Sequence, residues 1–390
     1  MVVRFFIACI VILNAIAFGH KYPEEYMNVT QIIQSRGYPC EQYYTITEDG
    51  YLLSIQRIPH GKGQKYNNTR MPVLVQHGLL DSSNTWVMNS DIESLAFILA
   101  DSGHDVWLSN SRGNMYSNRN IYIPVTKEKF WEFSFDEMAK YDLPAVMGLV
   151  LNTTGHQKLN YVGHSQGTLI AFIEFSQNQK LAAKVNKVAA LAPFVTLTHM
   201  KGILDFVAPF TNEINLFAAL VGINDFLPSD QFTRTIGRKA CGGDFKWFCE
   251  ELIMVICGPD WKNLNSSRVG IYLSHFPAGT SRQNLVHYGQ LVETSGTHEY
   301  NYGYVGNLEH YHSLDAPSYN ISRYNVATAL FSGSNDFLAN PGDVDVLRSL
   351  IPHAIKKDVV MDGWNHMDFV WGDKAYQSVY ADVVSFFGDS

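Results

Sequence analysis

The amino-acid sequence predicts an α/β fold, in which a mostly parallel β-sheet is flanked by helices and carries an inserted, mainly helical segment. Three observations lead to this fold class. A hairpin pattern stands near the N-terminus, short apolar runs then alternate with helical stretches, and this alternation stops near residue 196 and returns after about residue 320. The chain has 390 residues, 46% of them hydrophobic, which is enough for a large core in one or two domains.

The hairpin pattern lies at residues 41–58, which read EQYYTITEDGYLLSIQRI. Apolar and polar side chains alternate on both sides of the dipeptide Asp49-Gly50, which favours a tight turn between antiparallel strands. We therefore expect an antiparallel hairpin at one edge of the sheet.

Four apolar runs follow the hairpin and are expected to be strands that are covered on both faces. They are residues 72–76, 105–109, 159–162 and 188–191. Residues 90–103 and 135–155, which lie between these runs, have the apolar spacing of helices. After the interruption, residues 326–336 and 354–366 restore the strand pattern, so we expect the sheet to end with two late strands. Residues 20–195 and 321–390 thus form the predicted core domain, and residues 196–320 the insertion.

The first 19 residues have the pattern of a secretory signal peptide. Arg4 precedes an apolar run, residues 5–16, that is too short to span a bilayer comfortably, and small residues follow where cleavage would occur. The alternative is an uncleaved membrane anchor. The whole chain carries a formal net charge of −8, which makes nucleic acid a poor guess for a partner.

Ser165 is the candidate nucleophile. It lies in GHSQG, residues 163–167, directly after a predicted strand and directly before a predicted helix. A tight strand-to-helix turn of this G-x-S-x-G kind strains the serine backbone and lifts its hydroxyl clear of the sheet. Side chains at Gly163 and Gly167 would collide with the neighbouring strand and helix. The alternative is a serine in an ordinary structural turn.

A serine hydroxyl needs a base, and the base needs an orienting acid. In this architecture the acid and the histidine should follow the serine in that order, on loops after later strands. Asp336 follows the strand in FSGSNDFLA and His366 follows the last strand in GWNHMDFVWG, so these two are the predicted partners. Three other acids compete for the role: Asp343 and Asp345, which we expect to cap a helix, and Asp368.

The reaction also needs N–H donors for a developing oxyanion. One donor should be the backbone N–H of Gln166, the residue after the candidate nucleophile. The other should come from the loop after an early strand, where VLVQHGLLDSS places Gly78 and then Leu79. We expect Leu79 N–H to be the second donor.

Four cysteines remain once Cys9 leaves with the signal peptide, and three of them cluster in CGGDFKWFCEELIMVICG, residues 241–258. Their wide spacing and the lack of a nearby histidine make a zinc site a weak interpretation. One local disulfide is expected, and the spacing alone leaves its pairing open. Candidate glycosylation sequons begin at the following residues: Asn28, Asn67, Asn152, Asn265 and Asn320.

The chain closely resembles the animal acid lipases, a family that includes gastric, lingual and lysosomal acid lipases and insect lipases similar to them. The matching blocks span nearly the whole mature chain. They are QHGLLDSSNTW (76–86), DVWLSNSRGN (105–114), FWEFSFDEMAKYDLPA (130–145), YVGHSQGT (161–168), FSGSNDFLA (331–339) and WNHMDFVWG (364–372).

The resemblance implies an α/β-hydrolase core with a cap domain and a movable lid in residues 196–320. It places the family's catalytic triad on Ser165, Asp336 and His366, and its oxyanion donors on Leu79 and Gln166. It places the family's cap disulfide on the two cysteines that come first in the cluster, Cys241 and Cys249. No metal, other cofactor or colipase is implied.

The expected function is hydrolysis of carboxylic ester bonds in neutral lipids, triacylglycerol or cholesteryl ester, through an acyl-enzyme. The expected partner is lipid at the surface of an aggregate or membrane, and an apolar lid face would suit it. A carboxylesterase for small soluble esters and a non-catalytic lipid-binding relative are the alternatives. We expect a secreted or lysosomal protein, and nothing in the sequence indicates the oligomeric state or the pH optimum.

Overall fold

The computed structural model describes residues 22–67, 69–203, 205, 225–226, 241, 246–260 and 262–388. The expected signal peptide, residues 1–19, lies outside the described residues, as does most of the stretch 204–245 in the expected insertion. No helix in the part of the chain that the structure describes is both long and apolar enough to cross a membrane.

One mixed β-sheet forms the centre of the molecule, in the order β1-β2-β4-β3-β6-β7-β10-β11, with the short β5 paired to β2. Its strands are β1 Glu41–Ile46, β2 Tyr51–Ile58, β3 Val73–Gln76, β4 Val106–Leu108, β5 Arg119–Asn120, β6 Leu159–His164, β7 Val185–Leu191, β10 Ala327–Gly333 and β11 Ile355–Met361. The predicted hairpin, β1 with β2, is antiparallel and lies at one edge. From β4 to β11 all neighbouring strands are parallel, so their carboxyl ends meet at one edge of the sheet.

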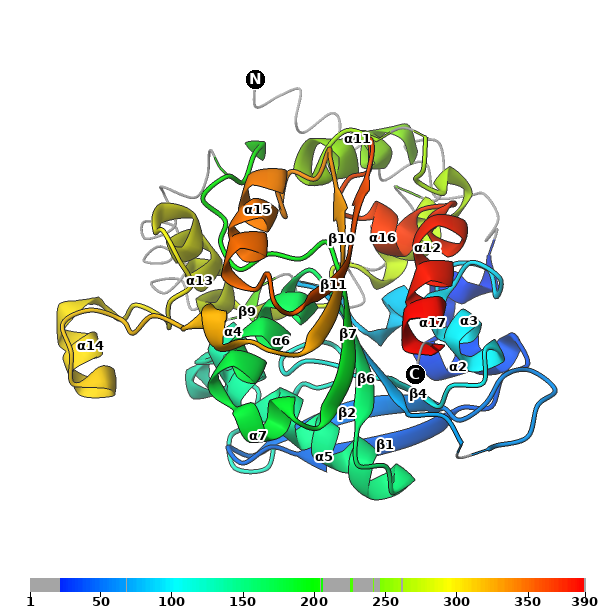
Figure 1. Ribbon diagram of the computed structural model, residues 1–390, viewed down its shortest axis with the longest axis horizontal. Helices are drawn as coiled ribbons and strands as arrows, with labels where there is room; N and C mark the ends of the chain where they lie inside the picture. Colours follow the sequence, from blue (N-terminus) through cyan, green and yellow to red (C-terminus); the bar gives the residue numbers. More distant parts are fainter. Residues whose placement is uncertain are drawn as a thin grey trace.

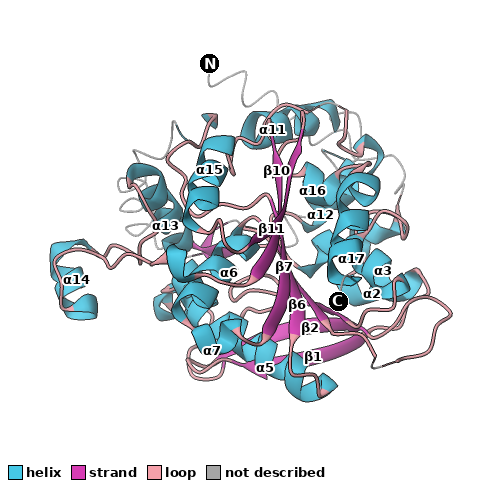
Figure 2. Ribbon diagram, viewed as in Figure 1, coloured by secondary structure: helices cyan, strands magenta, loops and turns pink. Residues whose placement is uncertain are grey.

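Helices cover both faces of the sheet (Figure 1). Figure 2 shows the sheet nearly edge-on, with α5, α6, α7 and α15 on one side and α2, α3 and α17 on the other. These core helices, with the short α4 and α16, are α2 Val29–Ser35, α3 Leu95–Asp101, α4 Phe135–Glu137, α5 Leu143–Thr154, α6 Gln166–Gln177, α7 Gln179–Ala182, α15 Pro341–Leu350, α16 Asp368–Trp371 and α17 Ala381–Gly388. All residues of β3, β4 and β6 are buried, as strands that are covered on both faces should be.

The chain between β7 and β10 is mainly helical where the structure describes it. Its elements are α11 Lys246–Cys257, α12 Val269–His275, α13 Arg282–Glu293, α14 Gly303–Tyr311 and a small sheet of β8 Asp225–Phe226 with β9 Thr280–Ser281. In Figure 1, α11 lies near the end of β10, whereas α14 projects from the body of the molecule.

The helix predicted over residues 135–155 is present but irregular. A π-helical turn, Met138–Asp142, separates α4 from α5. Because Pro144 has no N–H group, it cannot donate the regular α-helical hydrogen bond to the residue four positions earlier. The wider π-helical turn before it accommodates this missing bond. The Asp142 carboxylate at this turn accepts hydrogen bonds from Arg112, at 3.0 Å from the backbone N and 2.8 Å from Nε.

Candidate active site

Ser165 stands in the turn between β6 and α6. Its backbone has φ +53° and ψ −120°, a left-handed conformation that is strained for a residue with a side chain. The residue is buried and forms the N-terminal end of α6, where the helix dipole favours negative charge. The turn therefore presents one hydroxyl group at the carboxyl edge of the parallel strands.

The two glycines that flank Ser165 allow this turn to pack closely. A methyl group at Gly163 would lie 2.7 Å from the carbonyl group of Gly167 at the start of α6. A methyl group at Gly167 would lie only 2.4 Å from the carbonyl oxygen of Gln76 in β3. The collisions with the neighbouring helix and strand that the sequence predicts are thus present in the structure.

His366 lies in the loop after β11, and its Nδ1 is 2.9 Å from Oδ2 of Asp336 and 3.1 Å from Oδ1. Asp336 lies in the loop after β10, where its Oδ1 also accepts the N–H groups of Leu338 and Ala339 at 2.9 and 2.8 Å. A carboxylate only accepts hydrogen bonds, so Nδ1 of His366 carries the proton. The other ring nitrogen, Nε2, is left to act as a base.

The loop of His366 is joined to the serine turn by His164. Nε2 of His164 is 3.0 Å from the carbonyl oxygen of His366, and their ring centroids are 5.0 Å apart. Burial, with the neighbouring His366, lowers the pKa of His164 to about 3, so this ring is neutral and donates to the carbonyl. Sequence reasoning assigned His164 no role, and no local pattern signals one, because the contact spans 202 positions.

Nδ1 of His366 is hydrogen-bonded to Asp336 and, among the described residues, to none of the three competing acids. Asp343 lies in the first turn of α15, but the helix cap there is Asn340. The prediction that Asp343 and Asp345 cap this helix is therefore wrong for both residues. Its carboxylate instead accepts the N–H of His199 at 3.0 Å, while Asp345 pairs with Arg348 at 2.8 Å.

The predicted oxyanion donors lie on the two chain segments that meet at Ser165. A methyl group at Gly78 would be only 3.1 Å from Cβ of Ser165, so the loop after β3 passes directly beside the serine turn. Within the described residues, the N–H groups of Leu79 and Gln166 donate to no other backbone group. Both are thus available to a bound oxygen.

His77 fixes the orientation of the Gly78–Leu79 peptide. The N–H of Ser111 donates to Nε2 of His77 at 3.0 Å, so Nδ1 carries the hydrogen and donates to the carbonyl of Gly78 at 2.8 Å. In a trans peptide the carbonyl and N–H groups point in opposite directions, which turns the N–H of Leu79 away from His77. Burial lowers the pKa of His77 to about 4, so the pattern persists well below neutral pH.

Cys241 and Cys249 form a disulfide, which is the pairing that the resemblance implies. Cys40 and Cys257 are free, and burial raises the pKa of the Cys257 thiol far above its ordinary value. Among the described residues, no group of three or more His, Cys, Asp or Glu side chains is arranged to hold a metal ion.

The sequon asparagines all reach the surface. Those at 28, 67, 152 and 320 are exposed and Asn265 is partly buried. Asn28 also caps α2, where its Oδ1 accepts the N–H of Gln31 at 2.9 Å, and this leaves the amide nitrogen for a glycan. Glycan attachment at these positions stays a prediction.

Comparison with known proteins identifies the family. The model of the alpha/beta hydrolase fold matches residues 71–373, and that of the partial alpha/beta-hydrolase lipase region matches residues 29–90. Gastric triacylglycerol lipase of Homo sapiens is 44% identical over 367 residues, which cover 93% of this chain and 91% of the relative. Lipase member K of Homo sapiens is 41% identical over 386 residues, which cover 97% and 96%. The chain belongs to the animal acid lipases, a family with the alpha/beta hydrolase fold.

Proteins with little sequence identity to this acid lipase family member share its fold. A soluble variant of monoglyceride lipase from Saccharomyces cerevisiae, solved with a substrate analog, matches it with a TM-score of 0.55 at 15% identity. The match covers 90% of this chain and 95% of the other. At this identity the likeness concerns the fold alone.

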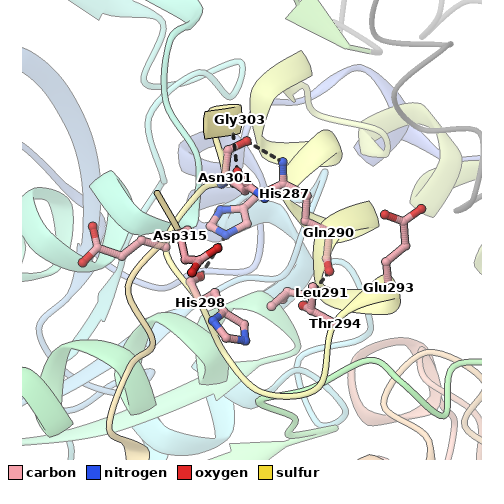
Figure 3. A pocket seen from close by; sticks show the side chains of 11 residues that line it. His287, Gln290, Leu291, Glu293, Thr294, His298, Asn301, Gly303 and Asp315 are labelled. Carbon is pink, nitrogen blue, oxygen red and sulfur yellow. Dashed lines mark hydrogen bonds between the residues drawn. The ribbon is translucent and has the colours of Figure 1, made fainter. Parts of the chain in front are cut away.

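A cavity of about 440 Å³ lies against α13, and none of the three predicted catalytic residues lines it. Figure 3 shows its walls, which come from α13 and from the chain that follows this helix. Gln290 and Asn301 exchange two hydrogen bonds of 2.9 Å there. The remaining walls carry imidazole and carboxyl groups such as those of His298 and Glu293, beside apolar side chains such as that of Leu291.

Proposed function

We propose that this protein is a serine hydrolase that cleaves carboxylic ester bonds of neutral lipids through an acyl-enzyme. The observation that carries the proposal is the strained Ser165 turn next to the oriented pair of Asp336 and His366. Residues 196–320 are assigned as a cap over this site, and the core domain is formed by residues 20–195 and 321–390.

Each residue has a defined role in the proposed reaction. Oγ of Ser165 attacks the ester carbonyl carbon while Nε2 of His366 takes the hydroxyl proton. The N–H groups of Leu79 and Gln166 stabilise the oxyanion of the tetrahedral intermediate. His366 then gives its proton to the departing alcohol, which leaves the acyl group on Ser165.

The second half of the reaction regenerates the enzyme. Nε2 of His366 takes a proton from a water molecule, the resulting nucleophile attacks the acyl carbonyl, and the carboxylic acid departs as Ser165 recovers its proton. Asp336 keeps its charge throughout and stabilises the imidazolium that forms in each half.

Lipid in an aggregate is the substrate class that the cap favours. α11 turns an apolar face outward, with Trp247 61% and Phe248 56% exposed, and Leu252 and Val255 about half exposed. An apolar surface of this kind suits contact with a lipid surface. The relative named gastric triacylglycerol lipase supports triacylglycerol as the first substrate to test, without colipase.

We infer a secreted or lysosomal protein from the Cys241–Cys249 bond, because disulfides form and persist in oxidising compartments. The relatives named gastric lipase and lysosomal acid lipase support both destinations. Localisation of the protein in its native cells distinguishes the two without affecting the proposed chemistry.

The test is hydrolysis of a triacylglycerol series, from short to long chains, across the solubility limit of each, at about pH 5 and pH 7.5. We expect a rate jump when aggregates form. Smooth saturation on dissolved ester without a jump would instead indicate a carboxylesterase for small soluble esters.

Ser165→Ala is the control, and it should fold normally but lose at least about 10³-fold in turnover, because the attacking oxygen is gone. A serine-directed phosphonate should label the wild type at Ser165 and leave the variant unlabelled. Retained turnover in the variant would contradict the proposal, and lipid binding without any labelling would indicate a non-catalytic lipid-binding protein.

A further inference from the structure

The chain segment 278–284, which leads into α13, contacts both chain segments that carry the predicted oxyanion donors. The N–H of Ala278 donates to the carbonyl oxygen of Leu80 at 2.6 Å. The side-chain amide of Asn284 donates to Oε1 of Gln166 at 2.9 Å. Leu80 directly follows the residue that supplies one predicted donor, and Gln166 supplies the other. One short piece of the inserted segment thus contacts both sides of the predicted oxyanion hole.

The contact with Leu80 fixes an unusual backbone conformation. Leu80 has φ +60°, which lies in the left-handed region that a residue with a bulky side chain seldom adopts. Its bonding partner Ala278 is held from a second side, because the carbonyl of Ala278 accepts the N–H of Met115 at 2.9 Å. The peptide that precedes Leu80, and with it the N–H of Leu79, is therefore kept in one orientation.

The side chain of Gln166 is anchored at both ends of its amide group. Oε1 accepts the amide of Asn284, and Nε2 donates to Sδ of Met138 at 3.3 Å. Gln166 and Asn284 are 2% and 0% exposed, so solvent does not compete for the bond between them. Rotation about the N–Cα bond of Gln166 would carry its side chain away from both partners. The two contacts therefore fix the direction of the Gln166 N–H.

Asn284 is itself held in place at the start of α13. Its backbone N–H donates to Oγ of Ser281 at 2.9 Å, and its amide also donates to Oγ1 of Thr280 at 3.1 Å. Ser281 caps α13, and its hydroxyl donates to the carbonyl oxygen of Phe133, which precedes α4. The donor that reaches Gln166 is thus fixed by bonds within the insertion and by a bond from the insertion to residue 133.

We propose that Asn284 is a positioning residue for the oxyanion hole, and that it acts through the side chain of Gln166. The inference rests on the proposed function. Asn284 donates no bond to the oxyanion, but it keeps the N–H of Gln166 directed at the position where negative charge develops. Donors in such a hole are effective because they are oriented before the reaction begins. Loss of Asn284 should therefore lower turnover and leave substrate binding unchanged.

A double-mutant cycle tests whether Asn284 acts through Gln166. The variants are Asn284→Ala, Gln166→Ala and the double substitution. Gln166→Ala keeps the backbone N–H at this position but removes the anchored side chain. Oδ1 of Asn284 accepts no hydrogen bond from the described residues, so Asn284→Ala removes only bonds that this side chain donates.

Asn307→Ala is the matched control. Asn307 is also a buried asparagine of the insertion, and its amide also donates two bonds, to Oδ1 of Asn301 and to the carbonyl of Leu314, each at 2.9 Å. Within the described residues, the hydrogen bonds of its side chain all lie inside the stretch 301–314. Asn307→Ala should therefore cost stability without an effect on turnover.

The measurement is kcat and KM on dissolved tributyrin, kept below its solubility limit so that binding to a lipid surface does not enter. The value of kcat is expressed per site that a serine-directed phosphonate labels at completion, so that unfolded protein does not imitate a loss of turnover. Asn284→Ala and Gln166→Ala should each lose about tenfold or more in kcat with KM within about twofold of wild type.

The double substitution should stay within about twofold of Gln166→Ala, because Asn284 has no partner to position once that side chain is gone. The control should keep kcat within about twofold of wild type. Losses that multiply in the double substitution would overturn the inference, because Asn284 would then act independently of Gln166. An unchanged kcat in Asn284→Ala, a loss in KM alone, or an equal loss of kcat in the control would overturn it too.

The inference can be decided even if Asn284→Ala does not fold, because an unchanged kcat in Gln166→Ala would overturn it. Phosphonate labelling separates this inference from the proposed function. A labelled wild type with losses that multiply removes only the inference, whereas a wild type that is not labelled removes the proposed function and the inference together.

Discussion

Gly167 shows how closely single residues fix the geometry at the serine turn. A methyl group there would lie 2.4 Å from the carbonyl oxygen of Gln76, so Gly167→Ala must push α6 away from β3. We expect the variant to lose about 1–3 kcal/mol of stability, as overpacked cores do, and to react more slowly with a phosphonate. Urea unfolding and the labelling rate check the two effects.

Gly148→Ala is the matched control for this substitution. Gly148 lies inside α5, and an added methyl group would meet nothing within 4 Å. Alanine there should raise stability by about 0.5–1 kcal/mol through helix propensity and leave labelling unchanged. If Gly167→Ala were as stable as Gly148→Ala, the close approach of α6 to β3 would be contradicted.

Single residues also show which parts of the site can be predicted from the sequence. Ser165, Asp336 and His366 could be selected because their order and their positions after strands follow from the chemistry of a triad. The role of His164 could not be found in this way, because its contact with the carbonyl oxygen of His366 spans 202 positions.

Among the elements, α11 supports the proposed contact with lipid. We expect the double substitution Trp247→Ser and Phe248→Ser to lower the ratio of emulsion activity to dissolved-ester activity about tenfold, because each ring that enters lipid contributes roughly 1 kcal/mol or more. The ratio is measured with long-chain triacylglycerol in emulsion and tributyrin in solution.

A second pair of exposed apolar residues provides the control. Tyr304 and Val305 lie on α14, which projects from the body of the molecule (Figure 1), and both are more exposed than the α11 pair. Their replacement by serine should leave the ratio within about twofold of wild type. Equal losses from both double substitutions would show that apolar exposure in general, and not α11, governs the action on emulsions.

The strands were predictable as elements, and the irregularities between them were not. Buried parallel strands give continuous apolar runs, and β3, β4, β6 and β7 lie where those runs stand. The π-helical turn before Pro144 was missed, because the apolar spacing over residues 135–155 indicates a helix but does not distinguish a π-helical turn from regular helix. The pairing of Cys241 with Cys249 came from the family resemblance, since the spacing left it open.

At the scale of the whole molecule, buried titratable groups make stability depend on pH. Five carboxyl groups have a pKa raised to about 7 or, for Asp368, about 9, chiefly by burial: Asp81, Asp136, Glu137, Glu174 and Asp368. Each holds a proton in the folded state that the unfolded chain releases above about pH 4. The stability that each contributes is therefore lost as the pH rises from about 4 through the pKa of its folded state.

Buried histidines act in the opposite direction. Burial lowers the pKa of His77 to about 4 and of His164 and His287 to about 3. Below about pH 6.5 the unfolded chain binds protons at these positions and the folded chain does not, so their contribution is lost as the pH falls. Among the described residues, more carboxyl groups have a raised pKa than histidines have a lowered one, so the carboxyl groups outweigh the histidines up to about pH 6.5, and above that pH the histidines no longer titrate.

We therefore expect a melting temperature that is higher at pH 5 than at pH 8 by about 5 °C or more. Glu174→Gln tests the cause, because Glu174 lies in α6 with its Oε1 accepting the amide of Asn178 at 2.9 Å, and glutamine keeps that acceptor without titrating. The variant should show a smaller difference between the two pH values than the wild type. Calorimetry at matched ionic strength measures both proteins, and a wild type that is more stable at pH 8 would contradict the raised carboxyl pKa values. If Glu174→Gln leaves the difference in melting temperature unchanged, Glu174 does not cause it. The effect would then come from the other carboxyl groups with a raised pKa, such as Asp368 and Asp136.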